Sequence, residues 1–364
     1  MKVLINRSDA IGDSILTSSM AKMIKDKFPD AKITFLIAAK SYDVFKDHPY
    51  IDSVQIYHRN ARFYLKIREV IKIFSEFRPT HYFYVGGGFM PNFVSWLFRI
   101  PFRGGLKSKW HTYLFLNKGI RQKRSMVDMH EMEYNLNLLE PMGIEYNYQD
   151  KNKYSPEISL SQTEIDEGMK VFNHDLVEAG IETGKKMIFI HPGMTGHTLN
   201  WSPRNYGRLV HKLEQKFPEQ FLFVISYTPS DHLYLQGIKE ILDKKENEYL
   251  QKRIYYFNGI KHGLRHYMTV LHQASLFVGP STGTTHIAAV LGVPVVGLYS
   301  PIKIQSALRW GPLSKNTDKT KLLVPDVICG EVRKCAERAC PYYECMGKIE
   351  VDDVVKQAIS VMEL

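Results

Sequence analysis

Short apolar runs and longer amphipathic stretches alternate along the whole chain, and this alternation predicts the fold class. Nine runs have the apolar character of strands in a buried parallel sheet: residues 3–6, 33–38, 54–57, 82–85, 187–191, 221–226, 253–257, 276–279 and 293–299. Segments with apolar residues at helical spacing fill the intervals. The pattern predicts an α/β protein in which each half of the chain forms a doubly wound parallel sheet.

A polar, turn-rich stretch divides the two series of strands. Residues 147–153 are mostly polar and Pro156 follows them, whereas Ser161 and Glu164 have the spacing of a capping box that opens a helix. A length of 364 residues suits two domains with separate cores. We expect a first domain over residues 1–160 and a second over residues 161–364.

Residues 277–300 predict a strand, a glycine-containing turn, a short helix and a second strand. Ser281, Thr282 and Gly283 fall where the helix starts, so backbone amides, two hydroxyls and the positive end of the helix dipole meet there. Such a position binds phosphate. The alternative is an ordinary strand–helix–strand crossover with a capped helix.

A similar loop opens the chain. Residues 7–13 follow the first strand, include Gly12, and lead into a helix that we expect to begin near Asp13. The Asp13 carboxylate is either a cap for that helix or a group that faces a ligand, because ligands bind beyond the carboxyl ends of the strands in open α/β sheets.

These two segments, residues 7–16 and 279–289, together resemble the ADP-heptose:lipopolysaccharide heptosyltransferase family, glycosyltransferase family 9. Three further segments are similar to that family as well: residues 130–139, 191–203 and 309–312. The resemblance implies a GT-B fold of two facing Rossmann-like domains with a cleft between them. It also implies that the last helix, residues 351–364, packs back on the first domain.

The resemblance further implies an inverting glycosyltransferase that needs neither a metal ion nor a cofactor. Asp13 would accept a proton from the acceptor hydroxyl, and the departing diphosphate would rest on backbone amides at the second helix start. The donor-binding residues expected in the second domain are Thr195, Gly196, Asn200, Ser281, Thr282, Gly283, Thr284 and His286. His286 has an alternative role as a helix residue bonded to neighbouring backbone.

Two positions depart from the family pattern. Ser281 stands where an aspartate is common, and Leu199 stands where a basic residue is frequent. His197, Arg204 or Lys303 could supply the missing cation. Two other functions therefore stay open. The protein transfers a sugar from a different nucleotide sugar, or it binds a sugar nucleotide or lipid without catalysing a reaction. The presence of Asp13 argues against the second of these.

The net charge of +10 is concentrated in one segment, since no carboxylate occurs between Glu76 and Asp128. Nine cations and many aromatic residues lie there. Such a surface suits nucleic acid, anionic lipid or an acidic glycolipid, or it is a solvated face. No nucleic-acid motif accompanies it, and the resemblance favours an anionic glycolipid acceptor. The acceptor-binding residues that we expect are Arg59, Arg62, Arg99, Arg103, Lys123 and Arg124.

Three further features complete the sequence-based expectations. No segment has the pattern of a signal peptide or a membrane span, so we expect a cytoplasmic protein. The basic segment and the resemblance together imply a peripheral position at the inner face of the cytoplasmic membrane. Gly86–Gly88 predicts a flexible turn that admits a large acceptor. Cys329, Cys335, Cys340 and Cys345 lack the C-x-x-C spacing of most zinc sites, so free thiols are expected, with a metal as the alternative.

Overall fold

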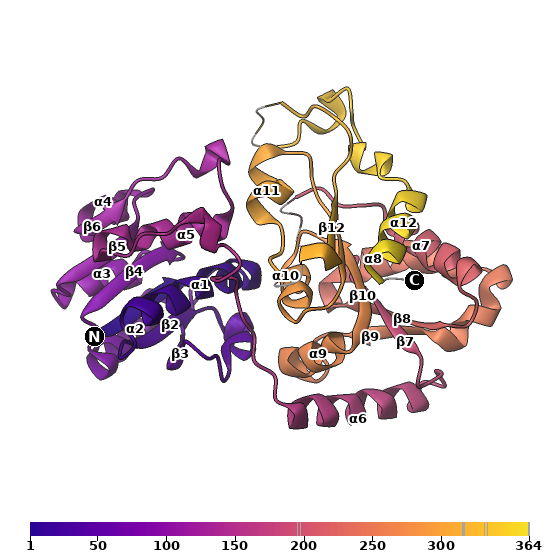
Figure 1. Ribbon diagram of the computed structural model, residues 1–364, viewed down its shortest axis with the longest axis horizontal. Helices are drawn as coiled ribbons and strands as arrows, with labels where there is room; N and C mark the ends of the chain where they lie inside the picture. Colours follow the sequence, from indigo (N-terminus) through magenta and orange to yellow (C-terminus); the bar gives the residue numbers. More distant parts are fainter. Residues whose placement is uncertain (195, 197, 315–316, 331, 333, 363–364) are drawn as a thin grey trace. The chain divides into compact units, whose positions relative to one another are not determined.

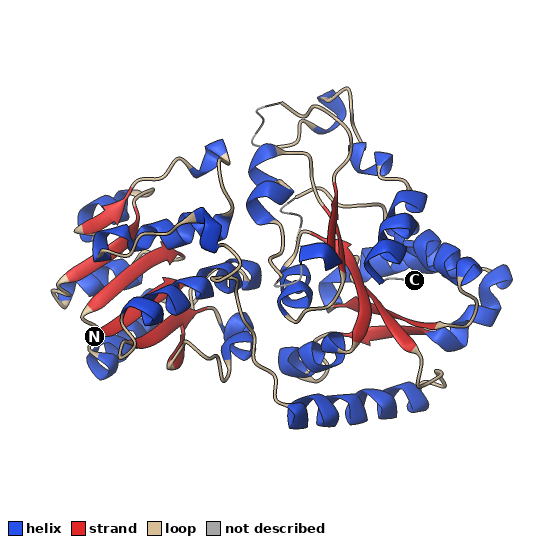
Figure 2. Cartoon of the chain, in the orientation of Figure 1, coloured by secondary structure: helices blue, strands red, loops and turns tan. Residues whose placement is uncertain are grey.

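The chain divides into two compact units, residues 1–159 and 160–364 (Figure 1). The computed structural model describes residues 1–194, 196, 198–314, 317–330, 332 and 334–362. In each unit, helices lie on both sides of a layer of strands (Figure 2).

The first unit contains a six-stranded parallel sheet in the order β3-β2-β1-β4-β5-β6. The strands are β1 (Lys2–Arg7), β2 (Lys32–Ile37), β3 (Ser53–Ile56), β4 (His81–Gly86), β5 (Phe102–Leu106) and β6 (Lys118–Ile120). The helices are α1 (Ile11–Lys27), α2 (Phe63–Phe77), α3 (Met90–Leu97), α4 (Trp110–Phe115) and α5 (Glu131–Leu136).

The sheet of the second unit has the order β12-β11-β10-β7-β8-β9, and all its strands are parallel. Read from β9 to β12, with β7 counted as the first strand, this is the same order as in the first unit. The strands are β7 (Lys186–Ile190), β8 (Phe221–Tyr227), β9 (Ile254–Asn258), β10 (Ala274–Pro280), β11 (Val295–Leu298) and β12 (Thr320–Leu323). The helices are α6 (Gln162–Glu178), α7 (Pro203–Lys216), α8 (His232–Leu242), α9 (Gly263–His272), α10 (Gly283–Val290), α11 (Ala307–Trp310) and α12 (Val351–Met362).

The predicted α/β class and the nine predicted strands are confirmed. The apolar runs form the centres of the sheets because helices cover both faces of each, and Val3, Leu4 and Ile5 of β1 have no exposed surface. The capping box is also confirmed, since Ser161 Oγ accepts from the Glu164 amide at 3.2 Å and Glu164 accepts from the Ser161 amide at 3.0 Å.

Three strands, β5, β6 and β12, were not predicted. The first of them contains Gly104 and Gly105, and Gly105 has a φ of 125°. A Cβ atom at Gly105 would lie 2.0 Å from the carbonyl oxygen of Tyr84 on the neighbouring strand. The close approach of the two backbones therefore requires glycine here. Because glycine stands where a strand usually has an apolar side chain, the sequence pattern did not indicate this strand.

The last helix, α12, packs into the core of the second unit, and its packing on the first domain stays a prediction. Its buried side chains, Val351, Val354, Val355, Ala358 and Val361, belong to the same core as β7, β8 and β10. Trp201 joins that core and donates from Nε1 to the Ile349 carbonyl at 2.9 Å. None of the helices in the described ranges combines the length and the apolar composition that crossing a bilayer requires.

Candidate active site

The strand order of each sheet places its ligand-binding edge. The order 3-2-1-4-5-6 reverses direction between the first and fourth strands of a unit, and the loops at their carboxyl ends leave a crevice there. In the first unit these loops are residues 8–10, after β1, and 87–89, after β4. In the second unit they are residues 191–202, after β7, and 281–282, after β10. All four loops were singled out from the sequence.

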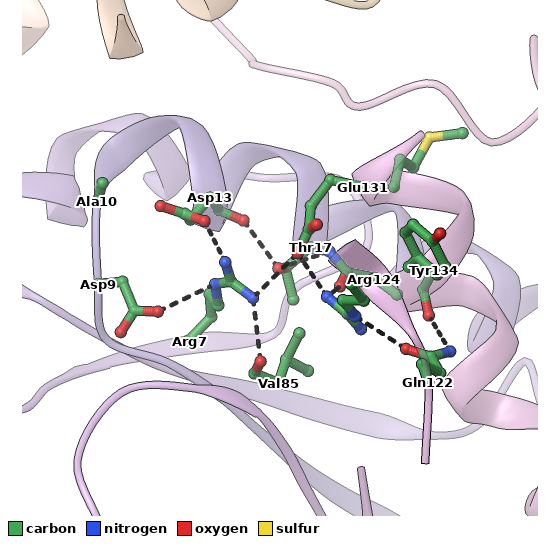
Figure 3. Close-up of polar contacts among 12 residues, drawn as sticks. Arg7, Asp9, Ala10, Asp13, Thr17, Val85, Gln122, Arg124, Glu131 and Tyr134 are labelled. Carbon is green, nitrogen blue, oxygen red and sulfur yellow. Dashed lines mark hydrogen bonds and ion pairs between the residues drawn. The ribbon is translucent and has the colours of Figure 1, made fainter. Parts of the chain in front are cut away.

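The side chain at the centre of the first site is Arg7, the last residue of β1, which is 5% exposed (Figure 3). Its Nη2 donates to Asp13 Oδ1, and its Nε lies 3.4 Å from Asp9 Oδ2. Its Nη1 donates to the Val85 carbonyl at 3.0 Å and lies 3.7 Å from Glu131 Oε1. One buried guanidinium therefore holds the Asp13 carboxylate in place.

Asp13 is not the cap of its helix. The N-terminal cap of α1 is Ala10, which makes no side-chain cap bond, and Asp13 lies in the first helical turn. The side chain of Asp13 keeps 19% of its surface exposed while it pairs with Arg7. This geometry leaves the carboxylate accessible at the sheet edge, as a group that reacts with a ligand must be.

Glu131 links Arg7 to a second buried cation. Arg124 donates from Nη1 to Glu131 Oε1, and to Asn135 Oδ1 at 3.0 Å. Asn135 in turn donates to Thr17 Oγ1 on α1 at 3.2 Å, which closes the network onto the helix that carries Asp13. The expectation that Arg124 binds the acceptor at the surface is therefore wrong, since Arg124 is 8% exposed and positions α5 against α1.

Burial and the neighbouring charges shift the pKa of two groups in this cluster, Arg7 and Asp9. Burial alone would lower the pKa of Arg7, but the neighbouring carboxylates Asp13, Glu131 and Asp9 outweigh burial and raise it. Burial raises the pKa of Asp9, although Arg7 opposes that shift. Arg7 consequently keeps its charge across the physiological range, and burial favours the neutral form of Asp9.

The glycines after β4 have a different role from the flexible turn that we expected. A Cβ atom at Gly86 would lie 2.4 Å from Asp9 Oδ2, and one at Gly87 would lie 2.2 Å from Ser8 Oγ. Gly87 also has a φ of 108°. These glycines let the loop after β1 cross directly over the end of β4, so they shape the site that contains Asp13.

In the second unit, α10 starts at Gly283, with Thr282 as its N-terminal cap residue. Thr282, Gly283 and Thr284 are partly exposed, and the hydroxyls of Thr282 and Thr284 lie 2.8 Å apart. Ser281 is 9% exposed and hydrogen-bonds to the buried phenol of Tyr299. The accessible part of the turn is therefore residues 282–284, with amides and hydroxyls suited to phosphate.

His286 lies deeper than a ligand-binding residue at this turn would. It is 4% exposed on α10, beside the apolar Ile287, which has no exposed surface. The structure thus favours the alternative role of a buried helix residue for His286.

The loop after β7 is held by internal bonds. Asn200 donates to the Pro192 carbonyl at 2.7 Å and accepts from the Trp201 amide at 2.8 Å and the Tyr206 hydroxyl at 3.1 Å. These bonds hold the loop, and contact of Asn200 with the donor stays a prediction. Gly196 has a φ of 73°, a conformation that favours glycine. Thr195 and His197 lie outside the described residues.

A neighbouring acid was not predicted from the sequence. Asp231 is 5% exposed and accepts from the Thr228 amide at 2.7 Å after β8. A Cβ atom at Gly193 would lie 2.3 Å from its carboxylate, so this glycine makes room for Asp231. The spacing of Thr228 and Asp231, a capping box at the end of an apolar run, is the signal that could have located it.

Two of the cations considered as substitutes near Leu199, Arg204 and Lys303, lie within the described residues. Arg204 is paired with Glu240 at 2.7 Å. Lys303 begins the short 3-10 helix Lys303–Gln305, and Gln305 accepts from Thr198 Oγ1 at 2.9 Å. That bond joins the segment of Lys303 to the residue next to Leu199.

Four of the six cations predicted to bind the acceptor lie exposed on the first unit: Arg59, Arg62, Arg99 and Lys123. Arg59 Nη1 lies 3.9 Å from Asp9 Oδ1 and so borders the site. Arg103 instead donates to the backbone carbonyls of Phe115, at 2.7 Å, and Ile100. Arg103 thereby braces β5, and its role in acceptor binding stays a prediction.

The four cysteines are free thiols, each half-buried. Two of them accept from an amide two residues further on, Cys335 from Glu337 at 3.3 Å and Cys340 from Tyr342 at 3.4 Å. Burial and the neighbouring thiols raise the pKa of Cys329 and Cys345. The thiols of Cys329 and Cys345 are therefore protonated and weakly nucleophilic at neutral pH.

Each of the two units has the strand order of a doubly wound α/β sheet and polar loops at its switch point, which is where proteins of this class bind ligands. The profile of Glycosyltransferase family 9 (heptosyltransferase) matches residues 85–335, more than half of the chain, which therefore belongs to this family. The resemblance noted from the sequence is thereby confirmed.

Individual relatives agree with this assignment. The chain is 25% identical to a provisionally named glycosyltransferase of Haemophilus influenzae, over 86% of both chains. It is 23% identical to lipopolysaccharide heptosyltransferase 3 of Escherichia coli, over 84% of this chain and 83% of that one. The structure of E. coli ADP-heptose lipopolysaccharide heptosyltransferase II matches with a TM-score of 0.78 at 20% identity, over 100% of this chain and 99% of that one. The last match shows that the fold is GT-B.

Proposed function

We propose that this protein transfers a heptosyl residue from ADP-heptose to an inner-core acceptor of lipopolysaccharide. The observation that carries the proposal is the Asp13 carboxylate, held by the buried Arg7 at the switch point of the first unit. The donor and acceptor classes are those in the names of two relatives, lipopolysaccharide heptosyltransferase 3 and ADP-heptose lipopolysaccharide heptosyltransferase II. In this proposal the first unit binds the acceptor and the second binds the donor.

Asp13 acts as the general base in this reaction. Its carboxylate accepts the proton of the acceptor hydroxyl as that oxygen attacks the anomeric carbon from the face opposite the diphosphate, which inverts the configuration. Arg7 is a positioning residue, because its guanidinium fixes the orientation of the carboxylate and is itself fixed by Val85 and Glu131.

The diphosphate leaves from the second unit. The amides at the start of α10 and the hydroxyls of Thr282 and Thr284 bind its oxygens, and the helix dipole stabilises the charge that develops there. Lys303 supplies the cation that the family commonly has at the position of Leu199. This set of donors stabilises the leaving group by itself, so the proposed reaction needs no metal ion.

The acceptor is an anionic glycolipid, and it binds the exposed cations of the first unit. Arg59 borders the site of the base, because its Nη1 lies 3.9 Å from Asp9 Oδ1. Such an acceptor is embedded in a bilayer, so we place the protein at the inner face of the cytoplasmic membrane as a peripheral protein.

A donor screen followed by a transfer assay tests the proposal. Stabilisation of the purified protein against heating by ADP-, GDP- and UDP-sugars ranks the donors, because a ligand that binds only the folded state raises its stability. ADP-heptose should rank first, transfer should persist in a chelator, and the anomeric configuration of the product should be inverted. Stabilisation by another sugar nucleotide alone would assign a different donor. Binding without transfer to any inner-core acceptor would indicate a silent binding protein.

A further inference from the structure

A group of apolar side chains lies exposed on α3, on α4 and in the loop before α3. The exposed fractions are 66% for Trp110, 66% for Leu114, 52% for Tyr113, 49% for Leu97, 48% for Trp96 and 38% for Phe89. We name these six residues the aromatic surface. Single exposed apolar residues are ordinary, but a contiguous group marks an interaction site.

Ring contacts join three members of the aromatic surface, Phe89, Trp96 and Trp110, into one group. Phe89 contacts Trp110 with ring centroids 6.2 Å apart, and Trp110 contacts Phe115 at 6.5 Å. Phe115 contacts Trp96 at 5.7 Å. The two tryptophans, which come from different helices, are therefore joined through one partly buried ring.

The segment that contains the aromatic surface carries charge of one sign. The segment from residue 77 to residue 127, which contains α3 and α4, carries no carboxylate. Arg99 follows α3 and is exposed, and Lys109 precedes Trp110 and is exposed as well. Exposed tryptophans with flanking cations are the side chains that settle at the headgroup level of an anionic bilayer.

The aromatic surface also adjoins the edge of the sheet that holds the base. Phe89 belongs to the loop after β4 that crosses Ser8 and Asp9 through its glycines. Lys109, next to Trp110, is close enough to Asp9 to lower the pKa of that carboxyl group, although burial raises it more. A bilayer bound at this surface would therefore present its headgroups to the loops around Asp13.

We propose that the aromatic surface docks the first unit onto an anionic lipid bilayer. The tryptophan and leucine side chains enter the headgroup region, and the cations beside them contact lipid phosphates. This proposal rests on the proposed function, since it names the surface that brings Asp13 to a membrane-embedded acceptor.

The test measures binding to vesicles of phosphatidylglycerol and phosphatidylcholine by co-sedimentation. The double variant Trp110→Ser with Leu114→Ser removes two of the most exposed side chains of the surface. The matched control is Leu233→Ser with Val177→Ser, which removes side chains that are 66% and 68% exposed in the second unit. Because all four side chains are mostly in solvent, both double variants should fold, and their melting temperatures check this.

We expect the wild type and the control to bind phosphatidylglycerol vesicles, and the binding to weaken as salt rises. The surface variant should bind on the order of 10- to 100-fold more weakly, because two apolar anchors are lost. Its tryptophan emission should also shift less on vesicle binding. Trp201 is 1% exposed and does not report on lipid.

An activity assay separates this proposal from the proposed function. On a deacylated, water-soluble acceptor the surface variant should turn over like the wild type, whereas on the acceptor in vesicles it should be slower. Equal vesicle binding by the surface variant and the wild type would overturn the proposal. Wild-type binding to pure phosphatidylcholine vesicles that equals its binding to phosphatidylglycerol vesicles would overturn it as well. A wild-type dimer that becomes a monomer in the surface variant would assign the surface to a second copy instead. If the wild type itself does not turn over the soluble acceptor, that result counts against the proposed function and not against membrane docking.

Discussion

The substitution Asp13→Asn separates the chemical role of this residue from its structural role. Asparagine has nearly the same shape and can still accept the hydrogen bond from Arg7 Nη2, but it cannot accept a proton. A general base typically contributes about 10²- to 10⁴-fold to the rate. We therefore expect turnover to fall by that order while the affinity for the donor, which the second unit binds, stays unchanged.

The expected cost in stability follows from the contacts of Arg7. After the substitution the guanidinium keeps Asp9 at 3.4 Å and Glu131 at 3.7 Å, so it is not left as an unpaired buried charge. What is lost is the charge on one acceptor. Hydrogen bonds to charged groups contribute about 1.5–3 kcal/mol and neutral ones about 0.5–1.5 kcal/mol, so the free energy of unfolding should fall by about 1–2 kcal/mol.

Arg7→Met gives the contrasting case. It leaves Asp9, Asp13 and Glu131 around an apolar side chain, with Arg124 as the remaining buried cation of the network. Removing one partner of a buried pair typically costs about 3–5 kcal/mol, so this variant should be the less stable of the two. Chemical denaturation measures both differences.

The matched control for Asp13→Asn is Glu214→Gln in the second unit. Glu214 pairs with Arg253 at 2.7 Å, and the two side chains are 2% and 3% exposed. The substitution therefore breaks a comparable buried pair away from the proposed base. It should lower stability and keep turnover. Near-normal turnover of Asp13→Asn on an authentic acceptor, with folding intact, would refute the assignment of the base. Asp9, a second and partly exposed carboxylate beside Arg7, would then be the next candidate.

Four further measurements test other parts of the structure. Gly283→Val should weaken donor binding at least about tenfold without unfolding the protein, because a side chain at the first residue of α10 covers the amides; unchanged nucleotide affinity by calorimetry would remove the phosphate site. Lys303→Met should slow turnover by about 10²-fold with little change in the affinity for the acceptor, and unaltered kinetics would exclude it as the leaving-group cation. Lys123→Glu should weaken acceptor binding in a salt-dependent way and leave donor binding unchanged; equal effects on both ligands would contradict the acceptor role. His48→Gln should flatten the pH dependence of unfolding. Burial lowers the pKa of His48 to about 4, so as the pH falls from about 6.5 to about 4 the unfolded chain takes up a proton that the native protein does not. The wild type should lose on the order of 3 kcal/mol of stability over that pH range. An identical pH profile in the variant would show that another group is responsible.

The sequence by itself determined the features that depend on local pattern. Continuous apolar runs identified β1 to β4 and β7 to β11, because a strand covered on both faces must be apolar along its length. The capping box at Ser161 and the helix start at Thr282 were likewise readable, since caps depend on side chains within a few residues of each other.

Only the tertiary structure decided which charged residues are buried. From the sequence, Arg124 is the last of nine cations in a segment without carboxylates. In the fold it contacts Glu131, seven residues away, and through it Arg7, which is more than a hundred residues away. A run of cations does not indicate which of them will meet a carboxylate, because that depends on how α5 packs against α1.

The same dependence on packing explains the missed strands and the loop glycines. The strand character of β5 and β6 comes from pairing with their neighbours, β4 and then β5, and not from their short, glycine-containing sequences. Gly86 and Gly87 are indistinguishable in sequence from a flexible turn, yet each admits a particular side chain, Asp9 or Ser8, from a loop nearly eighty residues earlier. Contacts between segments so far apart exist only once the sheet has formed, so the geometry that holds Asp13 is a property of the fold.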